Sequence, residues 1–463
     1  MSDDLITQQK QKAAGRRKES FRGTGFLRLW SGETVSVAGT EVTFMAIGIA
    51  AATTLAATPW QMGVLEAAES AAVLLLGLSA GVWADRYERR RIMLIANLAR
   101  CVLILSVPLL YWLDALTMPV LYAVVFLVGA LTLLFDSAMS AYLPRLLPRS
   151  QLERANSWME ASTSVGSVAG PGLAGVLIQV MSAPVALVVD SVSYLVSYLT
   201  LSRLPQAPPS ADPGTPDAEP QESHRHAVLK GLHLLRVDRI QRPMILAAAH
   251  FNIFHTMFFA VHTLFVLRVL DFSPGLLGAT SMAGGVAGLL GASFTPALTR
   301  LFGQGRTLII VYAAPGLSAL LVPLAHHTGD RGLAIALVSL STFTWTFAVV
   351  VNLVISETVK QTLVPDHLLG RVTATTRFVS WGVQPVGALL GGWLGGRLGL
   401  SEVMVVSAAG LFTSALWPLL SPVRNLVGPP DDDTDGGVTD GDGGDVDGAS
   451  GATSEPSPPP EKT

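Results

Sequence analysis

Charged residues and cysteine are scarce in this sequence. Only 14 % of its residues are Asp, Glu, Lys or Arg, whereas a soluble domain carries about 25 %, so the composition argues against an ordinary soluble protein. The single cysteine, Cys101, excludes a framework of internal disulfides. The sequence also lacks a phosphate-binding loop, a metal-ligand spacing and a nucleophile arrangement. We therefore expect no enzyme activity, no metal site, no cofactor and no nucleic-acid partner.

Long apolar stretches dominate the chain instead. Half of the residues are hydrophobic, and the mean hydropathy is +0.47. A helix needs about 20 mainly apolar residues to cross a bilayer core of roughly 30 Å. Twelve stretches meet this requirement, at residues 29–55, 61–83, 92–113, 119–143, 157–181, 183–203, 243–267, 274–301, 307–326, 332–357, 374–398 and 401–420. The sequence predicts an all-α membrane protein with twelve transmembrane helices, and the lipid bilayer is its first expected partner.

Basic residues indicate the orientation. The first 25 residues are polar and basic and lack the apolar core of a secretory signal, so we expect the N-terminus to be cytoplasmic. Lysines and arginines then fall on cytoplasmic segments, except for Arg100 within a span and Arg268, Arg331 and Arg397 near outer loops. An even number of spans places both termini in the cytoplasm. The expected location is the plasma membrane, specifically a bacterial inner membrane.

Composition divides the chain into five parts. A basic cytoplasmic tail (1–25) precedes an N-terminal six-helix half (26–204). A Pro-, Asp- and Glu-containing linker (205–240) leads to a C-terminal six-helix half (241–424). The final part (425–463) is acidic and Gly-rich and has too few apolar side chains to fold, so we expect it to be disordered.

The two halves resemble each other in sequence. A shift of 217 residues lays Pro148 on Pro365 and Gly175 on Gly392, and a shift of 215 lays "WADRYERRR" on "LTRLFGQGR". Parallel six-span repeats with a substrate site between them are one arrangement of secondary transporters. The repeat therefore favours a transporter that arose by duplication.

Two motifs and the repeat together resemble the major facilitator superfamily. The motifs are "GVWADRYERRR" (81–91), after the second span, and "GSVAGPGLAG" (166–175), in the fifth. The resemblance implies two six-helix halves that expose a central site alternately to the two sides of the membrane. Segments 26–42, 142–156 and 364–372 are similar to the branch that contains macrolide-type drug exporters and siderophore exporters.

The resemblance implies that the basic loop closes the cytoplasmic side against the start of the eleventh span. We call the residues of this expected contact the cytoplasmic latch: Gly81, Asp85, Arg86, Arg89, Arg90, Arg371 and Arg377. The alternative is that the arginines anchor the topology on anionic lipid, although this does not explain Asp85. Glu88 stands where the family usually has glycine.

The fifth-span motif removes side chains along part of a helix. Gly166, Gly170 and Gly175 let a neighbouring backbone approach closely, and Pro171 bends the helix. The resemblance associates such a glycine–proline motif with antiporters and therefore with export. The alternative is small-residue packing without a transport role.

Acidic residues inside spans are costly and call for a function or a partner. The proton-coupling candidates are Glu41, Glu66, Glu69, Asp136 and Asp190. Glu41 follows Trp30 by eleven residues, which places it about 16 Å deep, near the midplane. The alternatives are structural hydrogen bonds and, for Glu66 and Glu69, an exposed mouth.

Aromatic rings and imidazoles alternate along the seventh span. Phe251, His255, Phe258 and His262 are spaced by three and four residues and share a helix face. This face is a candidate wall for a cavity that accepts a bulky, partly aromatic or cationic ligand. The alternative is packing between helices with satisfied histidines.

These features together favour a proton-coupled exporter of amphipathic small molecules that are drug-like, macrolide-like or siderophore-like. Protons and the small-molecule substrate are then the expected partners, and we expect a monomer to suffice. The alternatives are an uptake symporter of the same fold and a transporter-like receptor or scaffold whose acidic tail recruits a partner.

Overall fold

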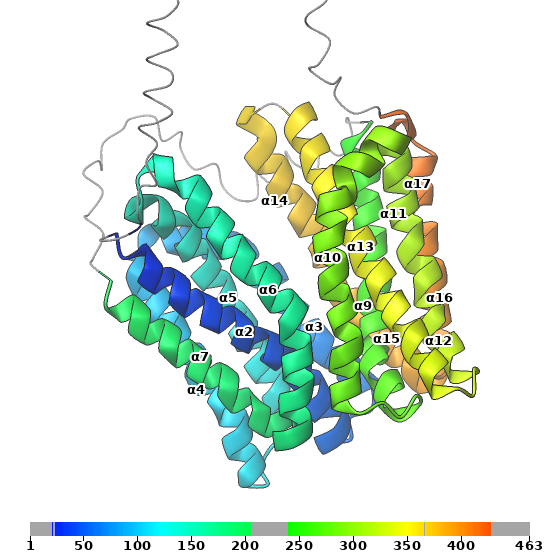
Figure 1. Cartoon of the computed structure of the whole chain (residues 1–463), viewed down its shortest axis with the longest axis horizontal. Helices are drawn as coiled ribbons and strands as arrows, with labels where there is room; N and C mark the ends of the chain where they lie inside the picture. Colours follow the sequence, from blue (N-terminus) through cyan, green and yellow to red (C-terminus); the bar gives the residue numbers. More distant parts are fainter. Residues whose placement is uncertain (1–20, 22–23, 205–238, 365, 427–463) are drawn as a thin grey trace, which may run out of the picture. The chain divides into compact units, whose positions relative to one another are not determined.

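The computed structural model is helical throughout the part of the chain that it describes, residues 21, 24–204, 239–364 and 366–426 (Figure 1). Within this part, the side chains of residues 77–86, 149, 366–371 and 374 are not described. The chain divides into two units, 1–427 and 428–463. The expected linker and the two expected tails lie almost entirely outside the described residues.

The first group of helices precedes residue 204. It contains α2 (Phe26–Ile49), its π-helical continuation η1 (Ala50–Thr54), α3 (Pro59–Arg86), α4 (Arg89–Trp112), α5 (Met118–Leu146), α6 (Arg149–Met181) and α7 (Ala183–Ser202).

The second group follows residue 240. It contains α9 (Gln241–Arg268), α10 (Pro274–Phe302), α11 (Gln304–Ala319), α12 (Leu321–His326), α13 (Arg331–Leu363), α14 (Asp366–Gly382), α15 (Gln384–Arg397), α16 (Leu400–Thr413), α17 (Leu416–Leu419) and the 3₁₀ turn η2 (Pro422–Asn425).

Ten helical segments of the described chain are long and apolar enough to cross a membrane. They coincide with ten of the twelve expected spans. The other two expected spans fall on α3 and on α14 with α15, which are not among the ten. The helix of the eleventh expected span is interrupted at Val383, so neither α14 nor α15 alone has the length of a full span.

Prolines and capping side chains mark where several helices begin. Pro59 and Pro274 open α3 and α10, where a missing backbone N–H costs nothing. Ser273 Oγ accepts a hydrogen bond from the Leu276 amide at 3.2 Å, and Asp330 Oδ1 accepts one from the Leu333 amide at 2.6 Å.

The two groups pack their helices in the same order. In the first group, α2 packs on α6 and α7, α3 on α5, and α4 on α5 and α7. In the second, α9 packs on α15 and α16, α10 on α13, and α11 on α13 and α16. Each contact of the first group thus has its counterpart about 215 to 217 residues later, as α3 and α10 show by starting at Pro59 and Pro274. The sequence repeat is therefore also a repeat of helix packing.

Among the described residues, the groups share an apolar core at one end. One cluster joins both groups through residues such as Ile49, Ala174, Phe265 and Leu277. These residues lie toward the ends at which α2, α6 and α9 finish and α3 and α10 begin. We call these the outer ends, following the orientation that the basic residues predict. Toward the opposite ends each group has a separate core of its own.

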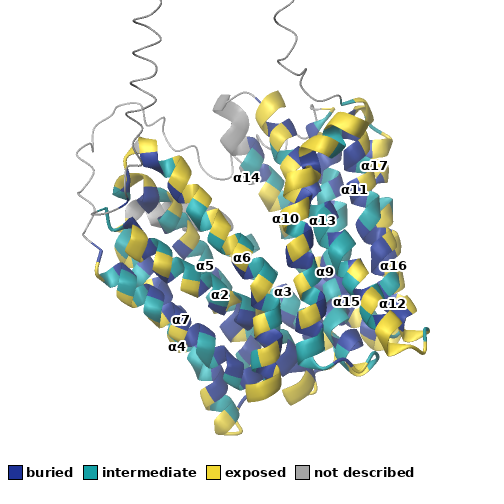
Figure 2. Ribbon diagram, in the orientation of Figure 1, coloured by how far each residue is buried: buried dark blue, intermediate teal, exposed yellow. Residues whose placement is uncertain are grey.

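Many large apolar side chains of the helices are exposed; Figure 2 marks exposed positions along the helices in yellow. Phe44, Val165 and Val180 are among those that remain mostly exposed. Apolar side chains on the surface of a helical bundle are favourable when lipid tails surround it. Together with the ten long apolar helices, they support a multi-pass membrane protein.

Candidate functional site

Glu41 lies where α2 touches the glycine–proline motif of α6. A Cβ placed on Gly170 would lie 2.5 Å from the Cβ and 2.7 Å from the Cγ of Glu41. The same helix carries Pro171 within its span, and a Cβ on Gly166 would meet Val37 of α2. The structure thus brings together two features that the sequence singled out separately.

A second face of the motif contacts the other group. A Cβ on Gly175 would lie 2.8 Å from the Pro274 carbonyl oxygen and 3.0 Å from Gly278 Cα. The backbones of α6 and α10 therefore approach each other more closely than any side chain at these two positions would allow. Helix α6 links Glu41 of the first group to α10 of the second.

A second close contact between two helix backbones lies at the positions that the sequence repeat relates to the first. A Cβ on Gly63 would lie 2.6 Å from the Ala388 carbonyl oxygen and 2.8 Å from Gly392 Cα, which joins α3 to α15. Gly392 is the counterpart of Gly175, and Gly63 that of Gly278. Two pairs of glycines at equivalent positions therefore hold the outer ends together.

A hydrogen bond adds to this outer contact. Arg268 Nη2 at the end of α9 donates to the Ala52 carbonyl oxygen at 2.6 Å. Ala52 belongs to the π-helical turn η1, where the usual backbone pairing is shifted. Arg268, one of the few basic residues expected near the outside, thus joins the two groups.

Asp190 of α7 is fully buried and held by hydroxyl groups. Thr43 Oγ1 donates to its Oδ2 at 2.5 Å, and Ser193 Oγ donates to its Oδ1 at 2.8 Å. These hydrogen bonds compensate in part for the loss of water around the carboxyl group. They fit the structural alternative for this residue as well as a coupling role.

Arg100 is the centre of a polar cluster inside the first group. Its guanidinium hydrogen bonds to Asn97 Oδ1 and, at 3.3 Å, to Thr132 Oγ1, and it lies 4.5 Å from the ring centres of Phe135 and Tyr194. Only 4 % of Arg100 is exposed.

Three carboxyl groups surround this arginine. Arg100 interacts electrostatically with Glu33, Asp136 and Asp190. Glu33 Oε1 also accepts a hydrogen bond from Ser197 Oγ at 2.8 Å. Asp190 is fully buried, Glu33 is partly buried and Asp136 is exposed.

Glu66 and Glu69 lie on α3, apart from this cluster. Glu69 is exposed and Glu66 half-buried, and the two carboxyl groups interact with each other. The structure therefore leaves both the coupling role and the exposed mouth open for this pair.

The cytoplasmic latch lies partly outside the described residues. The side chains of Gly81, Asp85, Arg86 and Arg371 belong to the parts that are not described. Arg90 Nη2 donates to the Ser202 carbonyl oxygen at 2.5 Å, which ties the start of α4 to the end of α7 within the first group. Closure of the latch stays a prediction.

The aromatic stripe of α9 packs around Trp345 of α13. The ring centre of Trp345 is 5.5 Å from that of His255, 5.2 Å from that of Phe258 and 6.1 Å from that of Phe251. The ring centres of His262 and Phe258 are 5.4 Å apart, with the two rings tilted relative to each other. Most of the stripe therefore lies in a packed aromatic cluster, and a role of these residues in lining the transport path stays a prediction.

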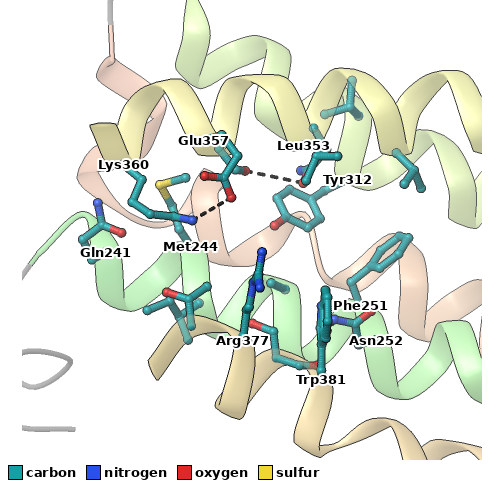
Figure 3. A pocket seen from close by; sticks show the side chains of 18 residues that line it. Gln241, Met244, Phe251, Asn252, Tyr312, Leu353, Glu357, Lys360, Arg377 and Trp381 are labelled. Carbon is teal, nitrogen blue, oxygen red and sulfur yellow. Dashed lines mark hydrogen bonds and ion pairs between the residues drawn. The ribbon is translucent and has the colours of Figure 1, made fainter. Parts of the chain in front are cut away.

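A cavity of about 290 Å³ opens beside this cluster (Figure 3). It lies within the second group, between α9, α11, α13 and α14, and Phe251 is the residue of the stripe that lines it. Its charged side chains are Glu357, Lys360 and Arg377, and its aromatic walls are Phe251, Tyr312 and Trp381. The latch candidate Arg377 is thus a cavity residue in this structure.

Sequence reasoning missed several residues of these sites. Glu33 and Arg100 lie in spans and carry charge, which was a usable signal for both. Lys360 is charged but lies beyond the expected tenth span, and Asn352 and Ser380 are uncharged. These three residues become neighbours only through the packing of α13 and α14. Among the described residues, no group of three or more His, Cys, Asp or Glu side chains could hold a metal ion.

A model of the Major Facilitator Superfamily matches residues 29–387. The chain belongs to this superfamily. Its members transport small molecules rather than transform them, so this chain is a membrane transporter and not an enzyme. With its long apolar helices and its bacterial relatives, it is a multi-pass protein of the inner membrane type.

Two groups of relatives in this superfamily are exporters by name. The chain is 26 % identical to the multidrug efflux pump Tap of Mycolicibacterium fortuitum over 376 residues, which covers 76 % of this chain and 85 % of Tap. It is also 26 % identical to the enterobactin exporter EntS of Escherichia coli, over 76 % of this chain and 79 % of EntS.

A solved structure has the same fold. The crystal structure of a bacterial homologue of the iron transporter ferroportin, in an inward-facing state, superposes with a TM-score of 0.69. The match covers 86 % of this chain and 98 % of that one, at 15 % sequence identity.

Proposed function

We propose that this transporter is a proton-coupled exporter of amphipathic small molecules that works by alternating access of its two helix groups. In this proposal the chain crosses the membrane twelve times, with α3 and the interrupted α14–α15 as the second and eleventh spans, and both termini are cytoplasmic. A monomer contains both groups and suffices for transport. The two exporter relatives support the direction.

The observation that carries the proposal is the contact of Glu41 with Gly170. A proton can drive transport only if its binding changes the balance between two arrangements of the protein. Glu41 of α2 packs against α6, and another face of α6 meets α10 at Gly175 and Gly278. A change in the charge and hydration of Glu41 therefore acts directly on a helix that joins the two groups.

The one-sided contact supports alternating access. Glycine pairs, Arg268 and a shared apolar core join the outer ends, whereas the cores at the opposite ends are separate. This is the arrangement expected of a transporter closed toward the outside. Opening would separate the glycine pairs, admit water to α6 and favour loss of the proton from Glu41, because a carboxylate is stable only when solvated or paired.

Export is tested in bacterial cells that lack their own pumps and express the chain, its Glu41→Gln variant or its Glu160→Gln variant. Glu160 is an exposed acid of α6, the helix that Glu41 of α2 contacts, and is the control. We expect wild type and Glu160→Gln to lower the retention of some amphipathic compound, a protonophore to abolish the effect, and Glu41→Gln to behave as empty vector.

Other outcomes identify the alternatives. Increased uptake on expression would indicate a symporter. Active export by Glu41→Gln would refute the coupling role of Glu41. If no compound moves although the protein reaches the membrane, and a cellular response is lost on removal of residues 427–463, the chain acts as a receptor or scaffold.

A further inference from the structure

We propose that the cavity between α9, α11, α13 and α14 binds an aromatic acid, with Arg377 as the residue that recognises its negative charge. This inference rests on the proposed transport function, because it assigns a substrate class to a transporter. It concerns a site inside the second helix group, away from the acidic cluster around Arg100.

The charges that line the cavity leave an unbalanced cation. Lys360 Nζ lies 2.6 Å from Glu357 Oε1, so these two residues form an ion pair. Only 7 % of the Lys360 side chain is exposed. No carboxylate within salt-bridge distance of Arg377 is found among the described residues, and its guanidinium lies 5.5 Å from the ring centre of Trp381. Figure 3 shows the Arg377 side chain extending from α14 toward α13, into the space that the other labelled residues surround.

Two residues that line the cavity, Asn352 and Ser380, carry hydrogen-bonding atoms without a partner among the described residues. Ser380 is only 3 % exposed, yet its Oγ has no hydrogen-bond partner among the described residues, and neither has Asn352 Nδ2. Ser356 Oγ donates a hydrogen bond to Asn352 Oδ1 at 3.5 Å. Buried polar atoms without partners are rare in folded proteins and call for an explanation. A ligand rich in acceptor oxygens would satisfy both.

The aromatic side chains that line the cavity favour a ligand with an aromatic skeleton. Phe251, Tyr312 and Trp381 line the cavity and present rings to it. A volume of about 290 Å³ is close to the lower limit of about 300 Å³ that is usual for small-molecule sites. The cavity therefore suits one fused or substituted aromatic system, or one aromatic arm of a larger molecule.

A ligand of positive charge fits the cavity poorly. A cationic ligand would meet Arg377 and would find Glu357, the acid that lines the cavity, already paired with Lys360. A guanidinium binds a carboxylate through two parallel hydrogen bonds and can stack on an aromatic face at the same time. Arg377 beside Trp381 offers an aromatic acid both contacts.

The test uses the purified full chain in nanodiscs and isothermal titration calorimetry with three probes of equal size. These are 1-naphthoate, 1-naphthamide and 1-naphthylmethylammonium, which differ mainly in charge. We expect the carboxylate to bind most tightly and the ammonium ion least. Arg377→Gln should weaken naphthoate binding by about 10- to 100-fold, the usual effect of losing a charge-assisted contact, and should leave naphthamide binding nearly unchanged.

The chain itself offers a matched control. Arg397 lies 4.7 Å from the ring centre of Trp393, four residues away in α15, and neither residue lines the cavity. Arg397→Gln should bind naphthoate like wild type, and Arg377→Lys should recover part of the affinity. If Arg377→Gln does not fold, Ser380→Ala provides a second probe and should lose several-fold in affinity for naphthoate.

Three results would overturn the proposal: no naphthoate binding by wild type, equal or tighter binding of the ammonium probe, or equal losses in Arg377→Gln and Arg397→Gln. Binding at equilibrium needs neither a gradient nor a direction of transport. Its failure is therefore distinguishable from failure of the export assay, and a protein that binds naphthoate without exporting any compound would refute only the proposed function.

Discussion

Alanine at Gly175 is expected to separate α6 from α10 at the outer ends of the helices. The added Cβ would lie 2.8 Å from the Pro274 carbonyl oxygen and 3.0 Å from Gly278 Cα. Because carbon atoms prefer separations of about 3.5–4.0 Å, the two helices must move apart by roughly 0.5–1 Å. Overpacking of this kind costs about 1–3 kcal/mol, and only the arrangement with closed outer ends bears this cost.

The cost translates into a shift of populations. A difference of about 1–3 kcal/mol between two arrangements changes their ratio by about 5- to 150-fold. Alanine also favours a helix over glycine by about 0.5–1 kcal/mol, but this gain is the same in both arrangements. The fraction with open outer ends should therefore rise by about one to two orders of magnitude.

Thiol labelling measures this fraction. Ala52 is 3 % exposed at the outer contact, so Ala52→Cys in a Cys101→Ser background reports its opening to a maleimide. Gly175→Ala should accelerate labelling by about 5- to 150-fold. Gly396→Ala is the control, because a Cβ there meets no atom within 4 Å. If Gly175→Ala labels no faster than Gly396→Ala, the glycine pair does not hold the outer ends together.

Further predictions concern the two sites and the aromatic cluster. Arg100→Leu should lower the free energy of unfolding of the purified protein by about 1–3 kcal/mol, because Asn97 then loses its charged hydrogen-bond partner inside the helix group. The exposed Arg145→Leu should have little effect, and equal effects would contradict the role of Arg100 in the cluster. Trp345→Ala should destabilise the protein by about 3–5 kcal/mol through the cavity it creates, as thermal unfolding can measure. Trp381→Ala should instead leave stability nearly unchanged and weaken naphthoate binding. Lower stability with unchanged binding would show that Trp381 stabilises the fold rather than the ligand.

The transmembrane helices and their repeat could be predicted from the sequence because a lipid bilayer permits few backbone structures. A backbone inside lipid must satisfy its own hydrogen bonds, so a long apolar run is a helix and its length is readable. Ten expected spans coincide with described helices for this reason. The interruption at Val383 was not predicted, although Gly382 precedes it and Pro385 follows it, and both residue types weaken a helix.

Contacts between helices were predicted much less well. Periodicity shows which side chains share a face but not which neighbour that face meets. The α9 stripe was thus identified correctly as a face, whereas its neighbour Trp345 and the cavity beside Phe251 depend on the packing of α13. In the same way the motif pointed to Gly175, but only the packing shows Gly278 as its partner.

The two proposed sites, for the proton and for the substrate, lie in different halves of the molecule. The acidic groups near Glu41 and Arg100 belong to the first group, whereas the cavity with Arg377 belongs to the second. Proton and substrate therefore do not compete for one carboxyl group. Their coupling must pass through helices that join the groups, and α6 is the one that touches both Glu41 and α10. Glu41→Gln should then lose proton-dependent export while the protein still binds 1-naphthoate, whereas with a shared site both would be lost together.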